Sequence, residues 1–136
     1  MKLGLVGSSG GHLTHLYLLK EFWEQEERFW VTFKKEDAVS LLKEERVFWC
    51  YFPTNRNIIN FFKNAVLAIQ ILKKENLSWK DCVCFGDSTN DIQMLKKAGL
   101  GIAMGNANDY VKSFADKVTA NVYDEGVAQG LKKAFD

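Results

Sequence analysis

An apolar run that ends in glycine and aspartate constrains this chain more than any other feature. Residues 82–85 are Cys-Val-Cys-Phe, Gly86 and Asp87 follow at once, and Asp91 comes four residues later. Such a run is typical of a buried parallel strand whose C-terminal end carries a binding or catalytic group. Asp91 is expected in the first turn of the next helix, so both carboxylates can face one small space. Two hard oxygen ligands so placed suit Mg²⁺.

Short apolar segments alternate with amphipathic segments along the rest of the chain. Strands are expected at residues 2–6, 29–33, 47–52, 82–85, 100–104 and 117–120, and helices at 13–22, 36–45, 57–75, 91–98, 108–115 and 126–135. This alternation predicts an α/β fold, a Rossmann-like, three-layer, doubly wound parallel sheet with strand order 3-2-1-4-5-6. In that order the first and fourth strands are neighbours, and the loop at residues 7–12 faces Asp87 across the crevice.

Composition favours a single domain over residues 1–136. The chain has 47% hydrophobic and 26% charged residues, which are ordinary globular values, and one proline. A net charge of +1 gives no reason to expect a nucleic-acid partner. No apolar stretch approaches the length of a signal core or an integral membrane segment. The three cysteines are an odd number, and Cys82 and Cys84 lie on one face of one strand. We therefore expect reduced thiols and a cytoplasmic location.

The sequence from about residue 77 to the end matches a known pattern. Its main matching segments are Phe-Gly-Asp-Ser-Thr-Asn-Asp-Ile at 85–92 and Ala-Gly-Leu-Gly-Ile-Ala-Met-Gly-Asn-Ala at 98–107, followed by residues 111–112, 115–116, 118–119 and 125–128. This part resembles the Cof-type phosphatases of the haloacid dehalogenase superfamily. The resemblance implies that Asp87 and Asp91 hold Mg²⁺.

The first part, residues 1–76, is similar to a different family. The matching segments are Gly-Ser-Ser-Gly-Gly-His-Leu at 7–13, Val-Thr-Phe at 31–33, Pro-Thr-Asn-Arg-Asn at 53–57 and Leu-Lys-Lys-Glu at 72–75. They resemble the acceptor-side subunit of a two-component sugar-nucleotide transferase of bacterial polysaccharide biosynthesis. That resemblance implies a half-site, a sugar-nucleotide ligand and a partner glycosyltransferase subunit. Since the two resemblances meet near residues 76–80, we hypothesise an engineered chimera of residues 1–76 and 77–136.

Phosphatase chemistry of the haloacid dehalogenase kind needs partners that the first strand does not supply. It uses an aspartate nucleophile and a second aspartate two residues later, and the expected Asp-x-Asp-Gly-Thr falls on Gly-Ser-Ser-Gly-Gly at 7–11. No acidic residue precedes Glu21, and the expected lysine falls on Asn64, next to Lys63. Attack by Ser8 or Ser9 would need His12 as a base, and a serine also needs that base oriented by a third group. We therefore expect no catalytic residue and no enzyme activity; an active chain would be a phosphatase.

The remaining site is expected to be a vestige. Asp87 and Asp91 alone leave most positions of an octahedral ion to water, so we predict a weak Mg²⁺ site. The glycine-rich loop can bring backbone N–H groups to an anion at a helix start. The predicted phosphate-binding residues are Gly7, Ser8, Ser9, Gly10, Gly11 and Asn90.

Structural roles compete with these predictions. Asp91 can act as a carboxylate at a helix N-terminus, and Ser88 or Thr89 can cap that helix. Three functions stay open: a hybrid scaffold with no complete active site, a magnesium-dependent phosphohydrolase, and a glycosyltransferase subunit.

Overall fold

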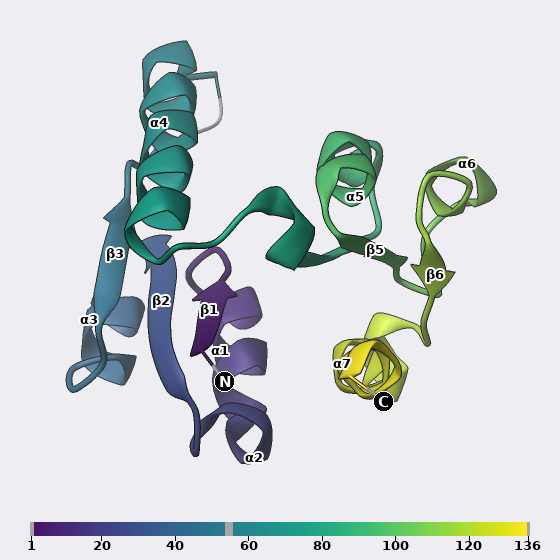
Figure 1. Cartoon of the computed structure of the whole chain (residues 1–136), viewed down its shortest axis with the longest axis horizontal. Helices are drawn as coiled ribbons and strands as arrows, with labels where there is room; N and C mark the ends of the chain where they lie inside the picture. The colour runs from purple at the N-terminus through teal and green to yellow at the C-terminus, as the bar shows by residue number, and fades with distance from the viewer. Residues whose placement is uncertain (1, 54–55, 136) are drawn as a thin grey trace. The chain divides into compact units, whose positions relative to one another are not determined.

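The computed structural model describes residues 2–53 and 56–135. They divide into two compact units, Met1–Gln70 and Ile71–Asp136. Each unit contains one three-stranded parallel sheet with helices on it (Figure 1). The repeated strand–helix succession in the sequence explains why every strand pair is parallel, since each helix returns the chain to the start of the next strand.

The first unit has the sheet order β1-β2-β3. Its elements are β1 (Lys2–Val6), α1 (Gly11–Leu18), α2 (Lys20–Trp23), β2 (Glu27–Phe33), α3 (Glu36–Leu41), β3 (Val47–Cys50) and α4 (Ile58–Lys74), which continues past the boundary between the units.

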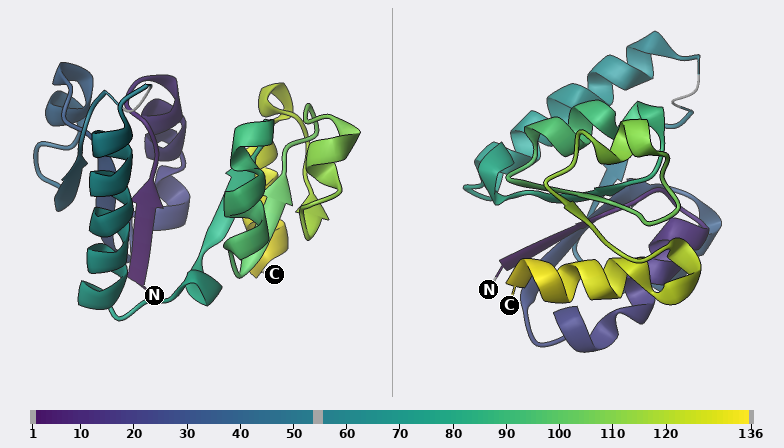
Figure 2. Two further views of the ribbon diagram at one scale, coloured as in Figure 1. Left: turned by 90° about the horizontal axis from the view of Figure 1, so that it is seen from above. Right: turned by 90° about the vertical axis from the view of Figure 1, so that its right-hand side faces the viewer.

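The core of the first unit lies between its sheet and the helices α1 to α3. Leu5 and Trp30 are register partners on β1 and β2, so their side chains share one face. They pack there with Leu13, Trp23 and Ala38, all buried. Figure 2 shows α4 on the opposite side of this sheet from α1 and α2.

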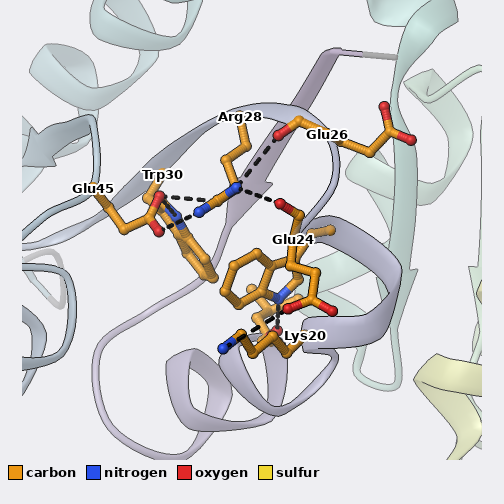
Figure 3. A network of polar contacts seen from close by, with 8 residues as sticks. Lys20, Glu24, Glu26, Arg28, Trp30 and Glu45 are labelled. Carbon is orange, nitrogen blue, oxygen red and sulfur yellow. Dashed lines mark hydrogen bonds and ion pairs between the residues drawn. The ribbon is translucent and has the colours of Figure 1, made fainter.

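An ion-pair network closes one edge of this core (Figure 3). The guanidinium of Arg28 donates to both carboxylate oxygens of Glu45, at 3.0 and 2.7 Å. Trp30 Nε1 donates to the same carboxylate at 3.1 Å. Arg28 also lies over the ring of Trp23, 4.6 Å from its centroid. The network ties β2 to the segment before β3.

The second unit has the sheet order β4-β5-β6. Its elements are η1 (Trp79–Asp81), β4 (Val83–Gly86), η2 (Thr89–Asp91), α5 (Ile92–Lys97), β5 (Leu100–Ala103), α6 (Asp109–Lys112), β6 (Lys117–Val118), η3 (Val122–Asp124) and α7 (Gly126–Phe135), where η marks a 3₁₀ turn.

Side-chain alternation along β4 and β5 builds three layers in this unit. Ala103 is buried with Leu95 and Val111, on the face covered by α5 and α6. Phe85, one residue before the register partner of Ala103, points to the other face. There α7 approaches so closely that a Cβ on Gly130 would lie 2.4 Å from the Phe85 ring. Figure 2 shows α5 and α7 on opposite sides of the sheet.

The predicted α/β, Rossmann-like fold is confirmed. The orders 3-2-1 and 4-5-6 occur within the two sheets. The pairing of the first strand with the fourth, and a single domain over residues 1–136, stay predictions.

One helix expected at residues 13–22 is two helices. Leu19 separates them, with ψ at 34°. The carbonyl of Leu16 accepts from Leu19 N–H at 3.2 Å and from Trp23 Nε1 at 2.9 Å. Burial of the Trp23 indole therefore occupies the oxygen that a continuous helix would give to Lys20 N–H.

Several other expected elements are shorter than predicted; the helix expected at 36–45, for example, spans Glu36–Leu41. The strand expected at 47–52 ends at Cys50, and the helix expected at 108–115 spans only Asp109–Lys112. The side chain of Asn64 accepts the N–H of Tyr51 and donates to its carbonyl, so both backbone groups of Tyr51 bond to Asn64 and not to a neighbouring strand. Ser113 Oγ donates to the carbonyl of Tyr110 at 2.7 Å, which ends the helix after one turn.

Candidate functional site

The end of β4 folds back onto the start of α5. One oxygen of Asp91, Oδ2, accepts the backbone N–H groups of Asp87 and Ser88, both at 3.0 Å, and the Ser88 hydroxyl at 3.1 Å. This is a capping box around η2. Capping by Ser88, one of the two predicted candidates, is confirmed, although Ser88 caps η2 and not α5. Asp91 is the N-cap of α5 and not, as expected, a residue of its first turn, because η2 precedes the helix.

Gly86 gives Asp91 the room for this arrangement. A Cβ built on Gly86 would lie 2.5 Å from the Cβ of Asp91 and 3.1 Å from its Oδ2. Any side chain at this position would displace the carboxylate. Gly86 therefore leaves the space that Asp91 occupies, and Asp87, which follows it, supplies the other carboxylate.

Asn106 fixes the second carboxylate. Its side-chain amide donates to Oδ2 of Asp87 at 2.9 Å, and its own oxygen accepts the N–H of Val122 at 3.2 Å. The sequence prediction of site residues missed Asn106. A signal existed, because Asn106 closely follows β5, and β5 pairs with β4 in parallel, with Gly86 opposite Ala103. Loops after neighbouring parallel strands meet at one edge of the sheet.

The two carboxylates fit a magnesium ion. Their recorded hydrogen bonds use Oδ2 alone, so within the described part of the chain Oδ1 of both Asp87 and Asp91 stays open to a ligand. Magnesium usually takes one or two carboxylates and fills its other positions with water or phosphate. Among residues 2–53 and 56–135, no three His, Cys, Asp or Glu side chains group as a metal cluster. Asn90 lies exposed within η2, beside this pair in sequence.

The glycine-rich loop after β1 has an internal anion of its own. Gly10 has φ of 81° and donates its N–H to Oδ2 of Asp37 at 2.7 Å. Ser8 Oγ lies 2.7 Å from Nδ1 of His12. Asp37 comes from α3, 27 residues along the chain, and no local pattern in the sequence marks it. The N–H of Gly10, one of the groups predicted to bind phosphate, therefore already donates to a carboxylate of the same chain.

The predicted site residues thus fall into two groups. Residues 7–11 belong to the first compact unit, and Asp87, Asn90 and Asp91 to the second. That the loop faces Asp87 stays a prediction, as does phosphate binding by either group.

The position expected for a phosphatase lysine has a structural role. Asn64 donates to the carbonyl of Tyr51 at 2.9 Å and accepts its N–H at 2.8 Å. Lys63 lies 5.1 Å from the centre of the Tyr51 ring. Lys63 belongs to the lining of an open, mostly apolar groove, together with Tyr51, Ile59, Phe62, Val66, Leu67 and Gln70. Thr54 and Asn55, in the transferase-like segment 53–57, lie outside the described residues.

Burial suppresses the reactivity of Cys84 in β4 and of Cys82 just before this strand. Burial, with a smaller contribution from Cys82, raises the pKa of Cys84 to about 11. Burial and the nearby Asp81 carboxylate also raise the pKa of Cys82. Cys50, Cys82 and Cys84 are all free thiols, as predicted. Their chemistry at neutral pH is that of small apolar side chains.

No helix among the described residues combines the length and apolar character that a membrane crossing requires.

Comparison with known proteins finds relatives among the haloacid dehalogenase-like hydrolases. The sequence profile of haloacid dehalogenase-like hydrolases matches residues 32–131. The 5-amino-6-(5-phospho-D-ribitylamino)uracil phosphatase YcsE of Bacillus subtilis is 43% identical over 82 residues, 59% of this chain and 32% of the relative. Kanosamine-6-phosphate phosphatase of the same organism is 35% identical over 71 residues, 52% of this chain and 25% of the relative.

Two solved structures are similar to about half of the chain. A protein of Geobacillus kaustophilus HTA426 has 44% identity and a TM-score of 0.48, over 52% of this chain and 28% of that one. The haloalkanoate-superfamily phosphatase BT1666 of Bacteroides thetaiotaomicron has 39% identity and a TM-score of 0.46, over 51% and 26%.

The matches cover only part of each relative. The chain spans about a third, or less, of the length of the two curated phosphatases. The family profile begins at residue 32, inside residues 1–76, for which a separate, transferase-like origin was predicted. It covers most of the chain, including Asp87, Asp91 and Asn106. The chain therefore belongs to the haloacid dehalogenase-like hydrolase family.

Proposed function

We propose that this chain acts as a magnesium-dependent phosphohydrolase of the haloacid dehalogenase kind. The observation that carries the proposal is the pair of carboxylates at the end of β4. Asn106 holds Asp87, and three donors from residues 87 and 88 hold Asp91. Each keeps one oxygen open within the described part of the chain. A family match over residues 32–131 supports the same function.

The substrate class is a phosphate monoester. Two related proteins of Bacillus subtilis are phosphatases of a phosphorylated ribitylaminouracil and of kanosamine 6-phosphate, by their names. A bound Mg²⁺ ion would neutralise charge on the phosphoryl oxygens. Asp87 and Asp91 would hold the ion weakly, since water or phosphate must fill its other positions. Asn90, and residues 7–11 in the other unit, are the proposed phosphate-binding groups.

A hybrid scaffold with no complete active site is the second candidate. The end of β1 supports it, because Gly7, Ser8 and Ser9 stand where an aspartate nucleophile and an aspartate acid/base are expected. Without that nucleophile, the covalent aspartyl-phosphate step of the family has no acceptor on this strand. On this account the chain would bind metal and phosphate without turnover. An engineered origin would accompany it.

The third candidate is a glycosyltransferase subunit. Only the sequence segments at 7–13, 31–33, 53–57 and 72–75 support it. It would require a sugar-nucleotide ligand and a donor-binding partner chain.

Turnover of p-nitrophenyl phosphate by the full chain separates these functions. The phosphohydrolase releases p-nitrophenol with Mg²⁺ and stops when EDTA removes the metal. The scaffold releases none in either condition, although Mg²⁺ with inorganic phosphate raises its melting temperature. A rise in melting temperature with UDP-GlcNAc, and none with phosphate, would instead favour the transferase subunit.

A further inference from the structure

A serine and a histidine in the first unit lie within hydrogen-bond distance of each other. Ser8 Oγ lies 2.7 Å from Nδ1 of His12. This is the distance at which a general base can take the hydroxyl proton. From this contact we propose that Ser8 is a base-activated nucleophile, with His12 as its base, and that it accepts the acyl group of small activated esters.

Regular elements hold both partners in place. The β1–β2 ladder continues to the residue before Ser8, since Gly7 N–H donates to the carbonyl of Val31 at 3.1 Å. His12 is the second residue of α1, and its neighbour Leu13 is 1% exposed in the core. The sheet and the helix therefore fix the backbone positions of both residues.

The pair is open to a ligand. Ser8 is half-buried and His12 is exposed. Gly7 and Gly11 flank the pair without side chains, and a Cβ on Gly11 would meet no atom within 4 Å. A small ester can reach the hydroxyl without a cavity, and an exposed site of this kind selects little beyond size.

The first turn of α1 carries backbone donors that can serve an oxyanion. The first helical hydrogen bond of α1 is Thr14 N–H to the carbonyl of Gly10, at 3.0 Å. For the N–H groups of Gly11, His12 and Leu13, no acceptor is recorded in the part of the chain that the structure describes. Amides at a helix start stabilise the oxyanion that forms when a hydroxyl attacks an ester carbonyl. Asp37 already holds the N–H of Gly10.

The reaction balances with water as the only co-reactant. Ser8 Oγ forms a bond to the carbonyl carbon while its proton passes to Nδ1 of His12. The bond between that carbon and the alcohol oxygen breaks, and His12 returns the proton to the departing alkoxide. Water then attacks the acyl-serine by the same route, which releases the carboxylic acid and restores the Ser8 hydroxyl.

Labelling with an alkyl fluorophosphonate tests this proposal, because the reagent phosphonylates activated serines with loss of fluoride. The full chain is labelled, weighed intact and mapped by peptide mass spectrometry. We expect one adduct per chain, on Ser8. Ser8→Ala should abolish the adduct, while Ser40→Ala, an exposed serine of α3, should keep it.

The role of His12 needs its own readout. His12→Ala should slow labelling and p-nitrophenyl acetate hydrolysis by about 100-fold, and added imidazole should restore part of the rate. His15→Ala, one turn along α1, is the matched control and should keep the rate within about twofold. An adduct on Ser9, labelling that survives Ser8→Ala, or an unchanged rate in His12→Ala would overturn the proposal. Since p-nitrophenyl phosphate turnover is measured separately, failure of either activity leaves the other to be judged alone.

Discussion

The side-chain amide of Asn106 donates to the carboxylate of Asp87 at 2.9 Å, across the ends of two paired strands. The same side chain accepts the N–H of Val122. Asn106, in the loop after β5, thus orients the carboxylate of Asp87 at the end of β4. The same side chain ties this carboxylate to the segment before α7. Groups that orient a metal ligand in this way commonly change metal affinity when they are removed.

Asn106→Ala should weaken Mg²⁺ binding. The variant frees Asp87 to rotate and leaves Val122 N–H without its acceptor, so we expect a loss of roughly 10-fold in Mg²⁺ affinity. Isothermal titration with Mg²⁺ and phosphate measures it. Asn108→Ala is the control, because Asn108 caps α6 through Val111 N–H and lies outside the proposed site. That variant should lose about 1 kcal/mol of stability and keep its Mg²⁺ affinity.

Gly86→Ala should disturb Asp91. The new Cβ would lie 2.5 Å from the Cβ of Asp91, so the carboxylate must leave the amides of Asp87 and Ser88. We expect a loss of about 1–3 kcal/mol of unfolding free energy, measured in urea, together with weaker Mg²⁺ binding. Gly11→Ala supplies the comparison, since its added methyl meets open space. Equal stability of the two variants would show that Asp91 does not depend on Gly86.

The Arg28–Glu45 pair should contribute more to stability than an exposed pair. The side chains are 23% and 16% exposed, and the guanidinium binds both carboxylate oxygens. Glu45→Gln should cost about 1–3 kcal/mol, because it also weakens the acceptor of Trp30 Nε1. Glu24→Gln removes the looser Lys20–Glu24 pair, at 3.8 Å, and should cost less than about 0.5 kcal/mol. Urea unfolding followed by tryptophan fluorescence compares the variants, and similar costs would contradict the difference in burial.

Cys84 should resist alkylation at pH 8. Its pKa of about 11 leaves roughly a hundredfold less thiolate than an ordinary thiol has at that pH. A variant with Cys50→Ala and Cys82→Ala isolates this thiol for reaction with iodoacetamide, and urea-unfolded protein is the control. The raised pKa also makes stability fall as pH rises from about 9 to 11, because the unfolded thiol ionises first. Rapid alkylation of folded protein at pH 8 would show that Cys84 is not buried as described.

Local sequence signals predicted the parts of the fold that depend on near neighbours. The apolar run before Gly86 predicted β4, and the polar residues that follow it predicted capping by Ser88 or Thr89. Both depend on residues within five positions of one another. The order of strands within each sheet followed from the alternation of strands and helices, because short connections bring successive strands together.

Contacts between residues that are far apart in the sequence were not predicted. Nothing near Gly10 indicates that Asp37 accepts its N–H. The break at Leu19 depends on the indole of Trp23 reaching the carbonyl of Leu16, a contact that helical periodicity does not contain. Asn106 belonged to a recognised segment, yet its contact with Asp87 depends on the pairing of two strands. Such tertiary contacts decide the site, and residue spacing alone does not predict them.

The most direct test of the proposed function is the Mg²⁺-dependent rate of p-nitrophenyl phosphate hydrolysis, compared between the unaltered chain and Asp87→Asn. Asp109→Asn, in the first turn of α6, is the matched control. We predict turnover that requires Mg²⁺, falls by at least about 100-fold in Asp87→Asn and persists in Asp109→Asn. Absence of turnover in the unaltered chain, or an unchanged rate in Asp87→Asn, would contradict the proposal.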